Sequence, residues 1–177
     1  EKECRAALSE ELSIQGNEKE IFETIFTSFQ KVARVSPHLK WVEKTPTNEG
    51  NFKTWLSWYP TCKFIYLERD PFEVYAAIKK KRQAENVKYP ISHFIENYKK
   101  SIRLAKACAR EYPENFKIID FQELVNNQEV VMKNLCSFLQ ITFQEILLKP
   151  TKNGAEWLGN SMFRNNESKE IKADNLR

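Results

Sequence analysis

The stretch KFIYLERDPFEVYAAIKKKR (residues 63–82) decides the fold class of this chain. Residues 63–68 form an apolar run that is typical of a strand buried on both faces of a parallel sheet. Pro71 predicts the start of a helix, because a first helical turn leaves its N–H groups unbonded and proline has none to lose. We expect this helix to run to about Asn86. Arg69 therefore stands at the turn between a strand and a helix.

Helices and strands alternate around this unit. Apolar spacing predicts helices at 18–35, 51–59 and 91–112 and within 126–141, and strands at 40–46 and 116–121. The last helix is expected to turn five side chains inward: Val130, Met132, Leu135, Phe138 and Leu139. This alternation favours an α/β fold, with a parallel sheet flanked by helices. Three strands are few for such a sheet, so we expect the fold to be incomplete at its N-terminus.

The composition indicates a single domain over residues 1–177, with a polar, loop-like tail from about residue 164. The net charge of +4 suits an anionic ligand and does not indicate nucleic-acid binding. No apolar run reaches the roughly 20 residues of a membrane span. The chain has four cysteines without metal-ligand spacing and only two histidines. We therefore expect free thiols, no metal site and a cytoplasmic location.

Polar residues follow each predicted strand, and the carboxyl ends of the strands are where open α/β sheets bind ligands. Lys44 ends the first strand, Arg69 the second and Asp120 the third. An arginine beside a helix N-terminus suits phosphate or sulfate, and a lysine adds a compact positive charge. Together, Arg69 and Lys44 predict an anionic ligand. The alternative is that Arg69 pairs with Asp70 or Glu73 and only staples the turn.

Three segments together resemble the sulfotransferase superfamily, whose fold is related to that of P-loop kinases. They are WVEKTPTN (41–48), YPTCKFIYLERDPFEVYAAI (59–78) and FKIIDFQELVNNQEVVMKNLCSFLQI (116–141). WLGNSMF (157–163) resembles a late loop of that family, which folds over the nucleotide. The order and spacing of these segments are stronger evidence than any one motif. The family uses 3′-phosphoadenosine 5′-phosphosulfate (PAPS) as sulfuryl donor.

The resemblance implies a role for several residues. Arg69 matches the arginine that binds the 3′-phosphate of the nucleotide. Lys44 matches a catalytic lysine that stabilises charge on the transferring sulfuryl group and its leaving phosphate. Lys81 and Ser161 match further contacts to the nucleotide. Ala77 stands where the family usually has a serine that shares the 3′-phosphate.

The chain also departs from the family pattern. Phe121 falls where a tyrosine is common, and no glycine-containing loop follows a strand to cradle the 5′-phosphosulfate. Two explanations stay open: the chain lacks an N-terminal portion that carries this loop, or it is a degenerate, non-catalytic member. The usual general base of the family cannot be assigned to a residue here.

The resemblance implies transfer of a sulfuryl group from PAPS to a hydroxyl or amine, without a metal, and release of adenosine 3′,5′-bisphosphate (PAP). The acceptor would be a small molecule, a glycan or a protein. One alternative is a nucleotide-binding or protein-interaction module that has lost catalysis. Another is a P-loop kinase relative, with Asp120 positioned for Mg²⁺. The Golgi lumen replaces the cytoplasm as the expected location if an N-terminal anchor was removed.

Overall fold

The computed structural model describes residues 17–33, 40–152 and 155–156. It divides the chain into two compact units, residues 1–46 and residues 47–177. The two units are described separately below. The single domain expected over residues 1–177 stays a prediction, and the predicted loop-like tail lies outside the described residues.

The first unit contains helix α2, Glu18–Ala33, which confirms the helix predicted here. Its start is a reciprocal cap. The Asn17 side chain accepts the Glu20 N–H at 3.1 Å, and the Glu20 carboxylate accepts the Asn17 N–H at 2.9 Å. Phe22 and Phe26 of α2 pack against Trp41, with ring centroids 5.5 and 4.7 Å apart. The unit therefore gathers its aromatic rings on one side of α2.

The strand predicted at 40–46 is wrong. Residues 40–45 carry no strand, and a turn begins at Pro46. Within the described residues, no neighbouring strand takes up the N–H and C=O groups of this stretch, and a β-ladder requires such a neighbour. Val42 is 91% exposed, so apolar character here does not mean burial in a sheet.

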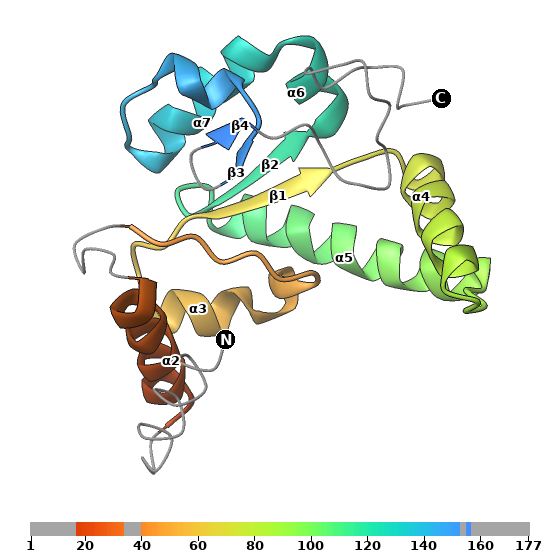
Figure 1. Ribbon diagram of the computed structural model, residues 1–177, viewed down its shortest axis with the longest axis horizontal. Helices are drawn as coiled ribbons and strands as arrows, with labels where there is room; N and C mark the ends of the chain where they lie inside the picture. Colours follow the sequence, from red (N-terminus) through yellow and green to blue (C-terminus); the bar gives the residue numbers. More distant parts are fainter. Residues whose placement is uncertain (1–16, 34–39, 153–154, 157–177) are drawn as a thin grey trace. The chain divides into compact units, whose positions relative to one another are not determined.

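The second unit is built on a parallel pair of strands. Strand β1, Phe64–Glu68, pairs with β2, Phe116–Asp120, and Glu68 lies opposite Asp120. The connection runs through α4, Pro71–Ala84, and α5, Ile91–Glu111. Figure 1 shows α5 on one side of this sheet, with α6, Phe121–Asn126, and α7, Gln128–Leu139, on the other. The predicted α/β class, with helices flanking a parallel sheet, is confirmed.

The core of this unit lies between the sheet, α5 and α3, Phe52–Trp58. A 3-10 turn, Asn48–Asn51, leads into α3 and presents Phe52, which is 1% exposed. The Phe52 ring makes edge contacts with Phe64, Tyr112 and Phe116 at centroid distances of 4.9, 5.2 and 5.2 Å. Aromatic rings favour this arrangement, so Phe52 links strands and helices at one point.

The other face of β1 corrects a prediction. Ile65 is 45% exposed and Leu67 is 48% exposed, so β1 is not buried on both faces in the described structure. On β2, the same face holds Ile119, which is 6% exposed. Helices α6 and α7 follow β2 directly, whereas α5 packs on the opposite face. The apolar run correctly predicted a strand but not how far each face is covered.

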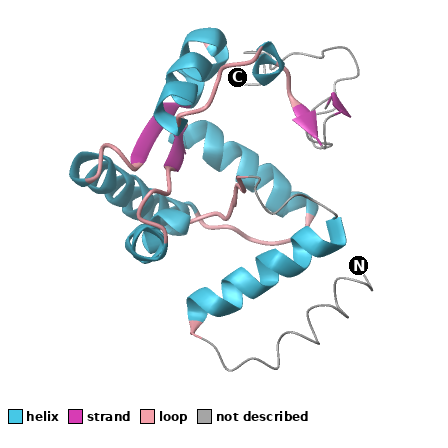
Figure 2. Cartoon of the chain, turned by 90° about the vertical axis from the view of Figure 1, so that its left-hand side faces the viewer, coloured by secondary structure: helices cyan, strands magenta, loops and turns pink. Residues whose placement is uncertain are grey.

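Helix α7 differs from prediction in the side chains it buries. Val131 and Cys136 are buried, whereas Val130 is 58% exposed. An α-helix turns by about 100° per residue, because it has about 3.6 residues per turn, so neighbouring valines face different ways. Beyond α7 come a 3-10 turn, Glu145–Leu148, and an unpredicted antiparallel pair, β3, Thr151–Lys152, and β4, Ala155–Glu156 (Figure 2). Among the described helices, none has the length and apolar composition to cross a membrane.

The described cysteines are free thiols, as predicted. Burial raises the pKa of the Cys62 and Cys108 thiols above the ordinary value. Because the thiolate is the reactive form, we expect iodoacetamide at pH 7 to modify both cysteines far more slowly in the native chain than in the chain unfolded in urea. Site-resolved mass spectrometry measures both rates. Equal rates in the two states would contradict the burial of these thiols.

Candidate functional site

The strand ends in Glu-Arg-Asp-Pro because Asp70 and Pro71 begin the next helix. The Asp70 carboxylate accepts the N–H groups of Phe72 and Glu73 at 2.9 and 3.1 Å, which makes Asp70 the N-cap of α4. Pro71 takes the first helical position, where an N–H is not needed. Arg69 therefore lies in a sharp turn between the end of β1 and the capped start of α4.

Removing this cap is expected to destabilise the chain. Asp70→Ala leaves two N–H groups without their acceptor and should lower the free energy of unfolding by about 1 kcal/mol. Urea denaturation followed by circular dichroism measures the change. Asp70→Asn keeps an acceptor oxygen and is the matched control. It should lower the free energy of unfolding by only a few tenths of a kcal/mol, as expected for about equal N-cap preference. An equal loss in both variants would mean that the cap is not what Asp70 contributes.

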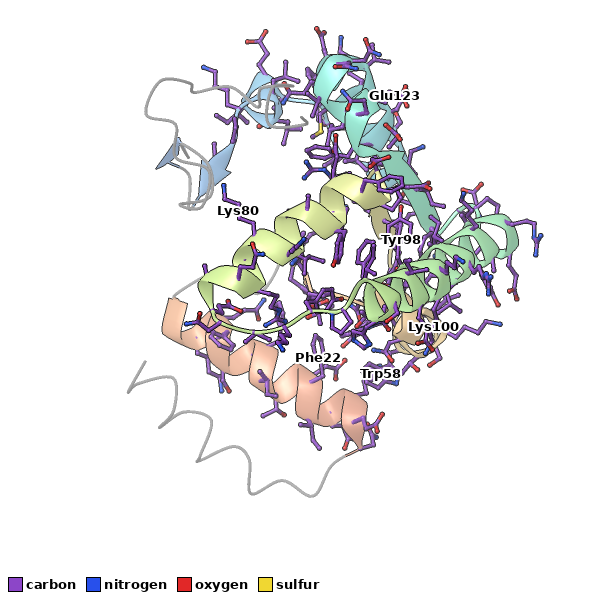
Figure 3. The ribbon with its side chains drawn as sticks, turned by 90° about the vertical axis from the view of Figure 1, so that its right-hand side faces the viewer. Phe22, Trp58, Lys80, Tyr98, Lys100 and Glu123 are labelled. Atoms are coloured by element: carbon purple, nitrogen blue, oxygen red, sulfur yellow. The ribbon has the colours of Figure 1, made fainter. Side chains whose placement is uncertain are left out.

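Three contacts hold Arg69. Its Nε donates to Glu73 Oε2 at 2.9 Å, and the two side chains are 29% and 23% exposed. The centre of the guanidinium lies 4.7 Å from the centroid of the Phe121 ring, at the start of α6. The Tyr98 hydroxyl, on α5, donates to the Arg69 carbonyl at 2.8 Å. Figure 3 shows Tyr98 on the side of α5 that faces α4.

The terminal nitrogens of Arg69 are left for other partners. The ion pair with Glu73 is made through Nε. Within the described residues, Nη1 and Nη2 make no hydrogen bond. A guanidinium carries five N–H donors in a planar fork, four of them on these two nitrogens. This is the part of an arginine that binds phosphate or sulfate through two parallel bonds. The predicted staple with Glu73 is thus present, and it leaves the fork open.

A cavity of about 440 Å³ opens at this point. It is lined by residues 68–71 and Glu73, by Tyr98, and by residues 120–122 where β2 turns into α6. The carboxyl ends of both strands therefore border it, as expected for a ligand site in an open α/β sheet. Burial, and then the charges of Glu68 and Asp70, raise the pKa of Tyr98 above its ordinary value, which favours the protonated phenol that donates to the Arg69 carbonyl.

The lining is more acidic than the sequence suggested. It contributes four carboxylates, and each has a partner. Glu68 pairs with Lys106 at 3.6 Å, Glu73 pairs with Arg69, and Asp70 and Asp120 cap helices α4 and α6. Across the described residues, no three histidine, cysteine, aspartate or glutamate side chains gather as they would around a metal ion. Arg69 is the cation that lines this cavity.

The other predicted site residues differ in what the structure shows of them. Ala77 and Lys81 are on α4 and do not line the cavity, and Lys81 Nζ lies 3.9 Å from Glu85 Oε1. With a rise of about 1.5 Å per residue, Lys81 is roughly 15 Å along the helix from Pro71. Lys44 is exposed in the first unit, and its convergence with Arg69 stays a prediction. Ser161 lies outside the described residues.

Two residues of the site were missed by sequence reasoning. Tyr98 lies on α5 with the buried residues Phe94, Ala105 and Cys108, and its spacing from them is a signal of an inward position but not of a partner. Phe121 was noted only for lacking a hydroxyl, whereas its ring faces the Arg69 guanidinium. Both contacts join residues far apart in the chain, which local patterns do not predict.

Comparisons with known proteins bear on the family and the fold. A family model described as the sulfotransferase family matches residues 2–145. The solved structure of a sulfotransferase domain from the curacin biosynthetic pathway is similar, with a TM-score of 0.59 and 21% identity over 81% of this chain. The chain spans 50% of the length of that structure, and the likeness shows the fold alone. The search of curated proteins found no match. The match over residues 2–145 shows that this chain belongs to the sulfotransferase family.

Proposed function

We propose that this chain carries the nucleotide-binding part of a sulfotransferase that uses PAPS as donor. Arg69 binds the 3′-phosphate of the nucleotide at the cavity between β1, α4 and α6. The observation that carries the proposal is the open fork of Arg69, a residue that lines this cavity and whose guanidinium is held by Glu73 through Nε alone. A charged fork fixed at the carboxyl ends of two parallel strands suits a phosphate ester.

The proposed reaction is the one that the family resemblance implies. An acceptor hydroxyl or amine forms a bond to sulfur while the bond from sulfur to the 5′-phosphate oxygen breaks. The acceptor loses its proton and PAP leaves. Lys44 offsets the negative charge that grows on the leaving phosphate, which a fixed cation does at low cost. Lys81 and Ser161 are further proposed contacts to the nucleotide, and Ala77 leaves one hydroxyl donor out.

Calorimetric titration tests the nucleotide site. We expect PAP to bind the chain with micromolar affinity, about a hundredfold more tightly than adenosine 5′-monophosphate (AMP), which lacks the 3′-phosphate. ATP with Mg²⁺ serves as the comparison for a kinase-like site. Equal affinities for PAP and AMP in a folded chain would overturn the proposed role of Arg69. Tighter binding of ATP with Mg²⁺ than of PAP would favour the alternative hypothesis of a P-loop kinase relative.

The acidic lining favours a second candidate, a nucleotide-binding or protein-interaction module without catalysis. Four carboxylates around one arginine oppose a ligand that carries several negative charges, even though each carboxylate has a partner. A chain that binds PAP but transfers no sulfuryl group to hydroxyl or amine acceptors, even when extended at its N-terminus, would support this candidate. Sulfuryl transfer by the extended chain would support the proposed sulfotransferase activity.

A further inference from the structure

We propose that Glu73 and Phe121 are positioning residues, which hold the Arg69 guanidinium in the orientation that receives a phosphate. The inference rests on the proposed function, because it concerns the same site. It assigns a role in orienting Arg69 to two residues that line the same cavity. Neither residue carries a group suited to binding phosphate: one is a carboxylate and the other a hydrocarbon ring.

The two contacts divide the guanidinium between them. Glu73 Oε2 accepts a hydrogen bond from Nε at 2.9 Å, on the inner edge of the guanidinium. The Phe121 ring lies against its flat face, with 4.7 Å between the guanidinium centre and the ring centroid. The outer edge, with Nη1 and Nη2, keeps its donors for a ligand. Tyr98 adds a third restraint, because its hydroxyl bonds the Arg69 carbonyl at 2.8 Å. Side chain and backbone of Arg69 are therefore both held before any ligand arrives.

Such restraint favours binding. A free arginine loses much rotamer freedom when it grips a ligand, whereas a held one has already lost it in folding. The Glu73 side chain is 23% exposed and that of Arg69 29%, so water and salt screen this pair less than a fully exposed one. Glu73 also lies in the first turn of α4, where its charge is favourable and keeps the carboxylate in place.

The opposite role for Glu73 is that of a competitor, an internal anion that a phosphate must displace. The geometry argues against it, because a phosphate can approach the outer edge of the fork without breaking the bond to Nε. The two roles predict opposite results when Glu73 is removed. A positioning residue makes binding weaker on removal, and a competitor makes it tighter.

The test compares the ratio of PAP affinity to AMP affinity in four variants. Glu73→Ala should reduce this ratio by about tenfold, because the guanidinium is no longer held, and Glu73→Gln should restore part of it. Phe121→Leu, which keeps apolar volume but loses the ring face, should reduce it by about threefold. Glu129→Ala is the matched control. Glu129 also lies in a first helical turn and pairs with the residue four positions away, Lys133, at 2.6 Å.

The ratio separates positioning from general damage, since a loosened fold weakens both nucleotides alike. In Arg69→Ala, adding Glu73→Ala should cause no further loss. An unchanged or increased ratio in Glu73→Ala alone, with the wild type preferring PAP, overturns the inference and leaves the proposed function standing. Equal binding of PAP and AMP by the wild type overturns the proposed function instead.

A second measurement needs no ligand, so it tests the role of Glu73 even if the wild type binds PAP and AMP equally. The ¹⁵N relaxation of Arg69 Nε reports how rigidly its side chain is held. We expect an ordered Nε–H in the wild type that becomes as mobile as that of an exposed arginine in Glu73→Ala. An Arg69 Nε–H that is equally mobile in the wild type and the variant contradicts positioning by Glu73.

Discussion

Phe52→Ala is expected to lower the free energy of unfolding by about 3–5 kcal/mol, the largest stability effect that we predict for a single substitution. Phe52 is 1% exposed and touches the rings of Phe64, Tyr112 and Phe116. Alanine removes the apolar surface and leaves a cavity that these partners, held by two strands and the end of α5, cannot easily close. Urea denaturation followed by circular dichroism and by tryptophan fluorescence measures the loss.

Phe72→Ala is the control for this substitution. Phe72 is also a phenylalanine in the second unit but is 81% exposed, so its replacement should change stability by no more than about 0.5 kcal/mol. Similar losses in the two variants would mean that the buried aromatic cluster does not hold the unit together. A loss of less than about 1 kcal/mol in Phe52→Ala would contradict the packing described here.

Arg69→Ala is expected to weaken PAP binding by about a hundredfold and to leave AMP binding nearly unchanged. The substitution removes the donor of the two hydrogen bonds proposed to the 3′-phosphate, each worth about 1.5–3 kcal/mol when the donor is charged. Calorimetric titration of both variants with both nucleotides gives the effect directly. The loss should be confined to the 3′-phosphate, because Arg69 is assigned to that group alone.

Arg82→Ala is the matched control for charge. Arg82 lies on α4, the helix that follows Arg69, and pairs with Glu85 at 3.1 Å, but it does not line the cavity beside Arg69. Its removal should change PAP affinity by less than about threefold, because at physiological ionic strength exposed charges beyond roughly 8 Å are largely screened. Equal losses in Arg69→Ala and Arg82→Ala would indicate a general effect of charge rather than a contact.

Local patterns in the sequence were sufficient to predict most elements of the fold. The helix that begins at Pro71 follows from the cap and the proline, and the parallel pairing of β1 and β2 confirms the order of strands and helices. Arg69 was expected at the mouth of the sheet for the same reason, and it lines the cavity there. Each of these inferences depends on residues close together in the chain.

Inferences that depend on distant residues were weaker. Residues 40–46 were predicted as a strand from their own character, but a strand needs a partner. Val130 was assigned to the core in place of Val131, because a stretch with two adjacent valines does not reveal which one faces the sheet. The contact between Arg69 and Phe121 joins the ends of two strands, and no spacing within either segment predicts it.

The central claim is that the cavity beside Arg69 receives the phosphate of the nucleotide. The most direct measurement is a titration with PAP followed by ¹⁵N-resolved NMR of the backbone and of Arg69 Nε. We predict that the largest shift changes fall on Arg69 Nε, on residues 68–73 and on residues 120–122. Changes centred instead on the cavity formed by α4 and the segment that joins it to α5, lined by Lys79, Arg82 and Lys88, would contradict the account.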